Sequence, residues 1–182
     1  MDEQDGDAQA AEGHLEALAP KMMAALELRR EGEDEQAAEL LGEILKAEPR
    51  LAEARLELCH MAAQRSDWEE AEAQGRLAVE TLRSGGQWTL DVEPAELMSF
   101  ALNLLGEVLV RDLSEGDLLM TDRPAFVARW NEASGLFKEA LESDNSNRDA
   151  RSNCIHYRPM SEEPSGEGSE LSSSSDAGSI TE

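Results

Sequence analysis

The stretch Asp67-Trp68-Glu69-Glu70-Ala71 decides the fold, because it places a tryptophan and an alanine three positions apart in a charged segment. The same spacing recurs at Trp130-Asn131-Glu132-Ala133, and a form without the aromatic residue occurs at Asp34-Glu35-Gln36-Ala37. Ala37 and Ala71 lie 34 residues apart, which is the length of one helix–turn–helix repeat. The spacing therefore predicts a stack of helical hairpins.

The composition narrows the fold class and the kinds of partner. The chain has 182 residues and a net charge of −24, so it repels nucleic-acid phosphates and anionic lipid headgroups. We therefore expect neither nucleic acid nor membrane as a partner, whereas a protein partner, including a basic one, is compatible with this charge. Hydrophobic residues make up 40% and aromatic residues only 4%, which favours an all-α protein built on Ala and Leu packing.

The sequence also predicts a cytoplasmic location, with export without a leader as the alternative. The first residues have neither the basic nor the apolar region of a secretory signal, and no apolar run approaches the 18 residues or so of a membrane span. The two cysteines, Cys59 and Cys154, form no disulfide framework.

The helical part is expected to span residues 17–158, between two acidic tails. Residues 1–16 and 159–182 have few apolar groups and are expected to be disordered, although a short helix over Ala8–Leu18 is an alternative for the first tail. Ser173 and Ser179 each precede an acid by three residues, as acidophilic kinases require, but an inert solubilising tail also explains them. Between the tails, periodicity and breakers predict helices at 20–30, 34–47, 51–64, 68–82, 94–111, 124–142 and 148–157.

Small and large apolar residues recur at fixed places in these helices. Leu105-Gly106, Ala133, Phe137 and Ala140 carry the pattern of a Leu-Gly pair followed by a second helix with Ala, Phe and Ala. Two earlier units match parts of the same pattern. The first unit matches it at Ala37, Leu41, Ile44 and Pro49, and the second at Leu58-Cys59, Ala62, Ala71 and Ala78.

Over roughly residues 18–145 the chain thus resembles tetratricopeptide repeat proteins. The resemblance implies a right-handed α-solenoid of about three helix hairpins, in units of about 18–50, 51–84 and 94–145, with a short capping helix at 148–157. It also implies that small residues such as Gly106 face the partner helix and allow its close approach.

The chain departs from the family pattern in one residue and two insertions. Gly75 stands where the family has a large residue, and the period is broken by insertions around Gly85–Pro94 and Leu113–Phe126. Trp88, in the first insertion, has two interpretations: it fills the space left at Gly75, or it is an exposed anchor for a partner.

The resemblance implies a concave groove that is lined by the first helix of each unit and binds a peptide or an amphipathic helix. The alternative is that these positions are ordinary surface residues. The carboxylate clamp of some family members is not matched, because Met22, Leu26 and Glu57 occupy its places. The implied groove residues are Met22, Leu26, Arg29, Arg30, Glu53, Leu56, His60, Gln64, Asn103, Glu107 and Arg111.

No motif in the chain indicates catalysis. It has no glycine-rich phosphate loop and no hydrolase signature, and Cys154 with His156 gives too few ligands for a metal site, so we expect no enzyme, cofactor or metal. The sequence thus predicts a non-catalytic scaffold or adaptor for protein–protein interaction. The alternative is a dedicated chaperone or assembly factor for one client, similar to the small acidic chaperones of secretion systems.

Overall fold

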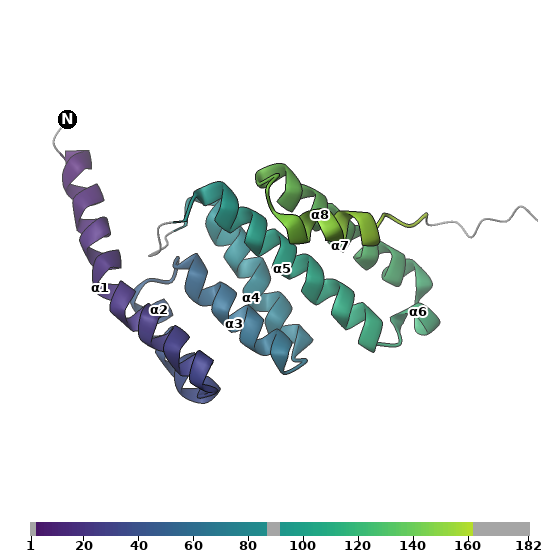
Figure 1. Cartoon of the computed structure of the whole chain (residues 1–182), viewed down its shortest axis with the longest axis horizontal. Coiled ribbons are helices and arrows are strands. Elements are labelled where there is room, and N and C mark those ends of the chain that lie inside the picture. Colours follow the sequence, from purple (N-terminus) through teal and green to yellow (C-terminus); the bar gives the residue numbers. More distant parts are fainter. Residues whose placement is uncertain (1–2, 87–91, 162–182) are drawn as a thin grey trace, which may run out of the picture.

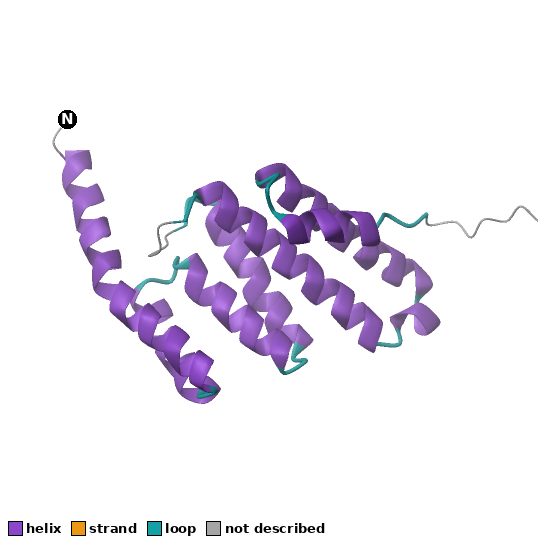
Figure 2. Ribbon diagram, viewed as in Figure 1, coloured by secondary structure: helices purple, strands orange, loops and turns teal. Residues whose placement is uncertain are grey.

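The computed structural model describes residues 3–86 and 92–161, which form helices joined by short connections (Figures 1 and 2). Within these residues no strand occurs, and the predicted all-α class is confirmed. The helices are α1 (Glu3–Glu31), α2 (Asp34–Ala47), α3 (Ala52–Gln64), α4 (Trp68–Arg83), α5 (Pro94–Glu115), α6 (Leu118–Thr121), α7 (Arg123–Ser143) and α8 (Arg148–His156).

The helices pack in chain order. α1 pairs with α2, α3 with α4 and α5 with α7, and each pair also contacts the next one through α2 and α3 or through α4 and α5. α8 follows the last pair and packs on both α7 and α5 (Figure 1). The result is a row of hairpins closed at one end by a short helix.

Local signals set most of the helix boundaries. The side chain of Asp122 caps α7 by accepting a hydrogen bond from the amide of Ala125 at 3.0 Å, and Pro94 and Pro124 occupy first turns, where a missing N–H costs little. Gly32 adopts a φ of +84° after α1, a conformation in which a side chain would be strained. These caps and breakers are visible in the sequence, which is why the predicted 34–47 helix coincides with α2.

The first helix is longer than predicted. The sequence suggested a helix that starts at Pro20 after a disordered stretch, but α1 begins at Glu3 and contains Pro20 in its interior. Residues 3–16 are thus helical, in line with the high helix propensity of alanine. Proline removes one backbone hydrogen bond and bends a helix without having to end it, and α1 changes direction part-way along its length in Figure 1.

The second insertion is also more helical than predicted. α5 continues to Glu115, and α6 lies within residues 114–122, where a loop was expected. Leu113 is buried against Phe126 and Val127 of α7, so the added turns of α5 are held by their own small apolar cluster.

Two glycines show how closely the helices approach. A Cβ on Gly106 would lie 2.6 Å from Cε1 of Phe137 on α7, which confirms that Gly106 faces its partner helix. A Cβ on Gly75 would lie 3.1 Å from Cδ1 of Leu105 and 3.3 Å from Sγ of Cys59. The predicted void at Gly75 is therefore absent, because Leu105 and Cys59 fill it. Trp88, for which filling this space was one of two interpretations, lies outside the described residues.

An ion-pair network joins α4, α5 and α7. The guanidinium of Arg129 on α7 bonds to Glu72 on α4 and, at 2.8 Å, to Asp112 on α5. Arg76 also bonds to Glu72, at 2.7 Å, and reaches Glu132 of α7 at 2.6 Å. Burial works to raise the pKa of the Glu72 carboxyl, but hydrogen bonds from the two arginines outweigh it, so the pKa is lowered.

Candidate functional site

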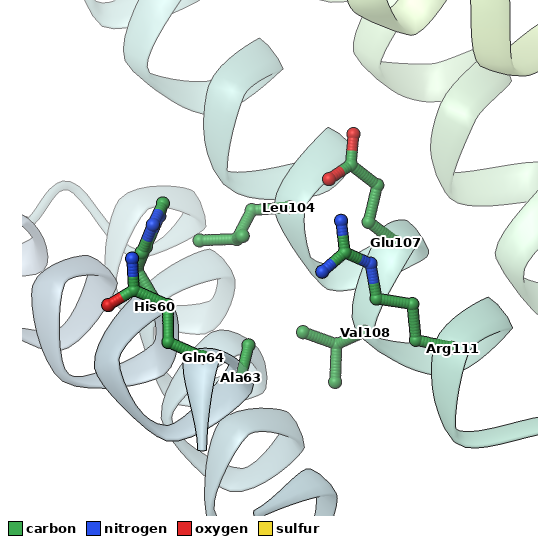
Figure 3. A pocket seen from close by; sticks show the side chains of 7 residues that line it. All are labelled: His60, Ala63, Gln64, Leu104, Glu107, Val108 and Arg111. Carbon is green, nitrogen blue, oxygen red and sulfur yellow. The ribbon is translucent and has the colours of Figure 1, made fainter. Parts of the chain in front are cut away.

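A hollow of about 210 Å³ lies between α3 and α5 (Figure 3). We call it the α3–α5 hollow. In Figure 3, Leu104 and Arg111 extend from α5 toward α3, where His60 and Gln64 stand on the opposite side. Its full lining is His60, Ala63 and Gln64 from α3 and Leu104, Glu107, Val108 and Arg111 from α5.

The hollow combines apolar walls with groups of both charges. Ala63, Leu104 and Val108 supply the apolar part, and Glu107 and Arg111 lie one helical turn apart on α5. Burial lowers the pKa of His60, the positive charges of Arg29 and Arg111 lower it further, and Glu107 partly opposes them. The imidazole is therefore held in its neutral form, in which one ring nitrogen donates and the other accepts a hydrogen bond.

Two asparagine side chains hold the carboxylate of Glu107 in the α3–α5 hollow. Oε1 of Glu107 accepts hydrogen bonds from Nδ2 of Asn103 at 2.9 Å and from Nδ2 of Asn153 at 3.0 Å. Asn153 belongs to α8 and also donates to Oδ1 of Asn103 at 2.9 Å. The capping helix thus orients a charged group of the hollow, a role for Asn153 that no repeat pattern in the sequence indicates.

A second hollow, of about 140 Å³, lies on α1, α3 and α5, nearer the start of α5. We call it the α1–α3–α5 hollow. Phe100 is its most open apolar residue, with 48% of its surface exposed. Glu57 lines the hollow and forms an ion pair with Arg29 of α1. Its full lining is Met22, Leu26, Glu53, Leu56, Glu57, Val92, Leu97 and Phe100.

The structure brings together most of the residues that the sequence placed in a groove. His60, Gln64, Glu107 and Arg111 line the α3–α5 hollow. Met22, Leu26, Glu53 and Leu56 line the α1–α3–α5 hollow.

Three of the predicted groove residues lie outside both hollows. Arg29 pairs with Glu57 at the edge of the second hollow, Asn103 bonds to Glu107, and Arg30 pairs with Glu27 in an exposed position.

Several predicted groove residues are less accessible than a binding groove requires. Met22, Glu53, Leu56 and Asn103 were expected on an open groove surface, but each is more than nine-tenths buried. Met22 belongs to the core between α1 and α2, and α8 packs over Asn103. The accessible part of the face therefore comes from Leu26, His60, Gln64, Glu107 and Arg111, together with Phe100.

Sequence reasoning missed Phe100, although a signal for it was present. Leu97, Phe100, Leu104, Val108 and Arg111 follow each other at three- or four-residue steps, which puts them on one side of α5. These five residues run through both hollows. The stripe could have been found from spacing alone.

The described residues contain neither a cluster of metal ligands nor a membrane-spanning helix. None of their His, Cys, Asp and Glu side chains form a group of three that could bind a metal ion. None of their helices combines the length and the apolar character needed to cross a membrane. Both cysteines are free, and burial raises the pKa of the Cys59 thiol to about 12, so this thiol is unreactive at neutral pH.

A scan against protein-family models gives no match to the chain, and a search of curated proteins gives none either.

Proposed function

We propose that the chain is a non-catalytic protein–protein interaction module, which binds a peptide or an amphipathic helix across the face formed by α1, α3 and α5. In this proposal the row of hairpins is a right-handed solenoid of about three tetratricopeptide-like units. The observation that carries it is that two neighbouring hollows are lined mainly by the first helices of successive hairpins and include eight of the eleven positions selected from the sequence alone.

The chemistry of the two hollows suggests what they bind. The α1–α3–α5 hollow offers Phe100 and Leu26 to an apolar side chain, and the α3–α5 hollow offers Arg111 and Glu107 to groups of either charge. The net charge of −24 speeds encounters with basic partners through long-range attraction. An amphipathic helix with basic residues beside its apolar stripe fits these features.

The proposal includes a location in the cytoplasm. Cys59 and Cys154 are both free, as is usual in a reducing compartment.

A matched pair of variants tests the binding face. Phe100 and Leu77 are both exposed apolar residues, with 48% and 40% of their surface open, but Leu77 lies on α4, away from both hollows. Partners are captured from the native host with the wild-type chain, Phe100→Asp and Leu77→Asp. The proposal expects a partner that is retained by the wild type and Leu77→Asp and lost with Phe100→Asp. A partner that Phe100→Asp retains, or that both variants lose, contradicts it.

The second candidate is a dedicated chaperone or assembly factor for one client. The exposed ring of Phe100 favours it, because an apolar surface of this kind is stabilised when a client covers it. One stoichiometric client that raises the melting temperature of the chain on binding supports the chaperone. Several interchangeable partners support the scaffold or adaptor.

A further inference from the structure

A short segment after α8 is held against α7 by side chains of that helix. Nε1 of Trp130 donates a hydrogen bond to the carbonyl oxygen of Arg158 at 2.7 Å. Nδ2 of Asn131 donates to the carbonyl oxygen of Met160 at 3.0 Å, and its Oδ1 accepts from the N–H of Met160 at 2.7 Å. We call residues Arg158–Met160 the strap.

These three hydrogen bonds engage only the main chain of the strap. The side chain of Met160 remains 39% exposed, and Pro159 is also exposed. An asparagine amide can pair with the N–H and the C=O of one residue at once, because it carries both a donor and an acceptor. A segment that binds in this way therefore needs a main-chain carbonyl at its first position and both a main-chain N–H and a carbonyl at its third.

The proline between these two positions suits the bound form. Its ring fixes φ near the extended region, and it also disfavours a helical conformation in the residue before it. A segment with a central proline thus loses little freedom when it binds in this way. Any peptide of the form X-Pro-Z, where Z is not proline, can supply the same three bonds.

The surface that holds the strap continues beyond it. A hollow of about 240 Å³ lies beside Pro159 and is lined by Asn131, Ser134, Gly135, Lys138 and Cys154. No atom lies within 4 Å of the place that a Cβ on Gly135 would occupy, so the helix surface there is open. The strap covers only one end of this surface.

We propose that this face of α7 binds an extended, proline-containing segment of a partner protein, which takes the place of the strap. The strap itself indicates the binding mode, because three hydrogen bonds to its main chain seat it there. Tethering to α8 gives the strap a high effective concentration, so a partner must displace an intramolecular competitor. The site lies on α7 and α8, apart from the hollows on α1, α3 and α5, and the proposal stands or falls independently of the function proposed for them.

The test weakens the strap while Trp130 and Asn131 stay intact. Met160→Pro removes the N–H that Asn131 accepts, and Met160→Ala is the matched control because it keeps that N–H and changes only the exposed side chain. The readout is the indole N–H resonance of Trp130 in the full chain, assigned by Trp→Phe substitution among the three tryptophans. We expect the resonance to move in Met160→Pro and to stay in place in Met160→Ala.

The probe is the synthetic peptide Tyr-Arg-Pro-Met-Ser, which copies residues 157–161. Added to Met160→Pro, it should return the resonance toward its wild-type position. The same peptide with proline in place of methionine loses one of the three bonds and should need about fivefold higher concentration, the factor that one hydrogen bond contributes. Asn131→Ala in the Met160→Pro background removes two of the bonds and should weaken the response further. A resonance that does not move in Met160→Pro, or that the first peptide does not return, overturns the proposal and leaves the strap as a purely structural cap.

Discussion

Replacing Gly106 with alanine tests the close contact of α5 and α7. The added Cβ would lie 2.6 Å from Cε1 and 2.9 Å from Cδ1 of Phe137. That ring has no exposed surface, and it stacks on Tyr157 with 5.3 Å between the ring centres, so it has little room to move. Overpacking of this kind costs about 1–3 kcal/mol. It is opposed by the gain of about 1 kcal/mol that alanine brings to a helix interior.

Gly42→Ala in α2 is the matched control, because no atom lies within 4 Å of the Cβ it would add. This variant should be more stable than the wild type by about 1 kcal/mol through helix propensity alone. The difference between the two variants cancels that gain, so Gly106→Ala should be less stable than Gly42→Ala by about 1–3 kcal/mol. Urea unfolding followed by circular dichroism measures both values, provided that the slopes agree. Equal stability of the two variants would refute the argument that Phe137 leaves no space at Gly106.

Four other substitutions test three further features by the same unfolding assay. Burial and nearby arginines lower the pKa of His60 below 6.5 in the folded protein, so the free energy of unfolding should fall as the pH drops below that value. This fall should be smaller in His60→Gln. Equal pH profiles of the wild type and this variant would contradict the lowered pKa. Arg129→Met should cost about 2 kcal/mol, because it removes charged hydrogen bonds that join three helices. Arg83→Met, at an exposed pair, should cost less than about 1 kcal/mol, and the reverse order would refute the argument. Asn147→Ala should cost about 1–2 kcal/mol because its side chain caps α8 at two amides, and an unchanged midpoint would show that the cap contributes nothing.

The sequence was a good guide wherever local chemistry decides the structure. The ends of α2 and α4 follow from Asp34, Asp67 and nearby breakers, and the helix of residues 34–47 was predicted without error. The small residue at Gly106 was correctly assigned to a helix–helix contact, because its reason is steric and repeats with the period.

The sequence was a poor guide wherever distant segments meet. The space at Gly75 is filled by Leu105, thirty residues later in the chain, and no local pattern indicates which side chain enters it. Asn153 reaches Glu107 only because α8 folds back onto α5, and the strap is recognised by helix side chains that a repeat pattern assigns no role. Pro20 was taken as a helix start because its cost inside a helix is usually prohibitive, yet α1 continues through it.

Eight of the eleven predicted groove residues line the two hollows, and their role in binding stays a prediction. Accessibility was misjudged at Met22 and Asn103, because burial depends on how neighbouring helices tilt and on a capping helix outside the repeat.

The packing of helices in chain order also determines how the molecule opens. Met22, Leu41 and Ile44 of the first hairpin share a core with Leu51 and with Met61 of α3, and this core is separate from the one around Leu102 and Leu105. In proteins built this way, each unit is stabilised by its neighbours only through the interface between them. A terminal unit can therefore unfold while the rest stays folded. Amide hydrogen exchange should therefore be graded along the chain and slowest in α5, which has neighbours on both sides. A client that binds α1 and α3 together would slow amide hydrogen exchange in α1 and α2. Its binding would then be measurable as increased protection of the first hairpin.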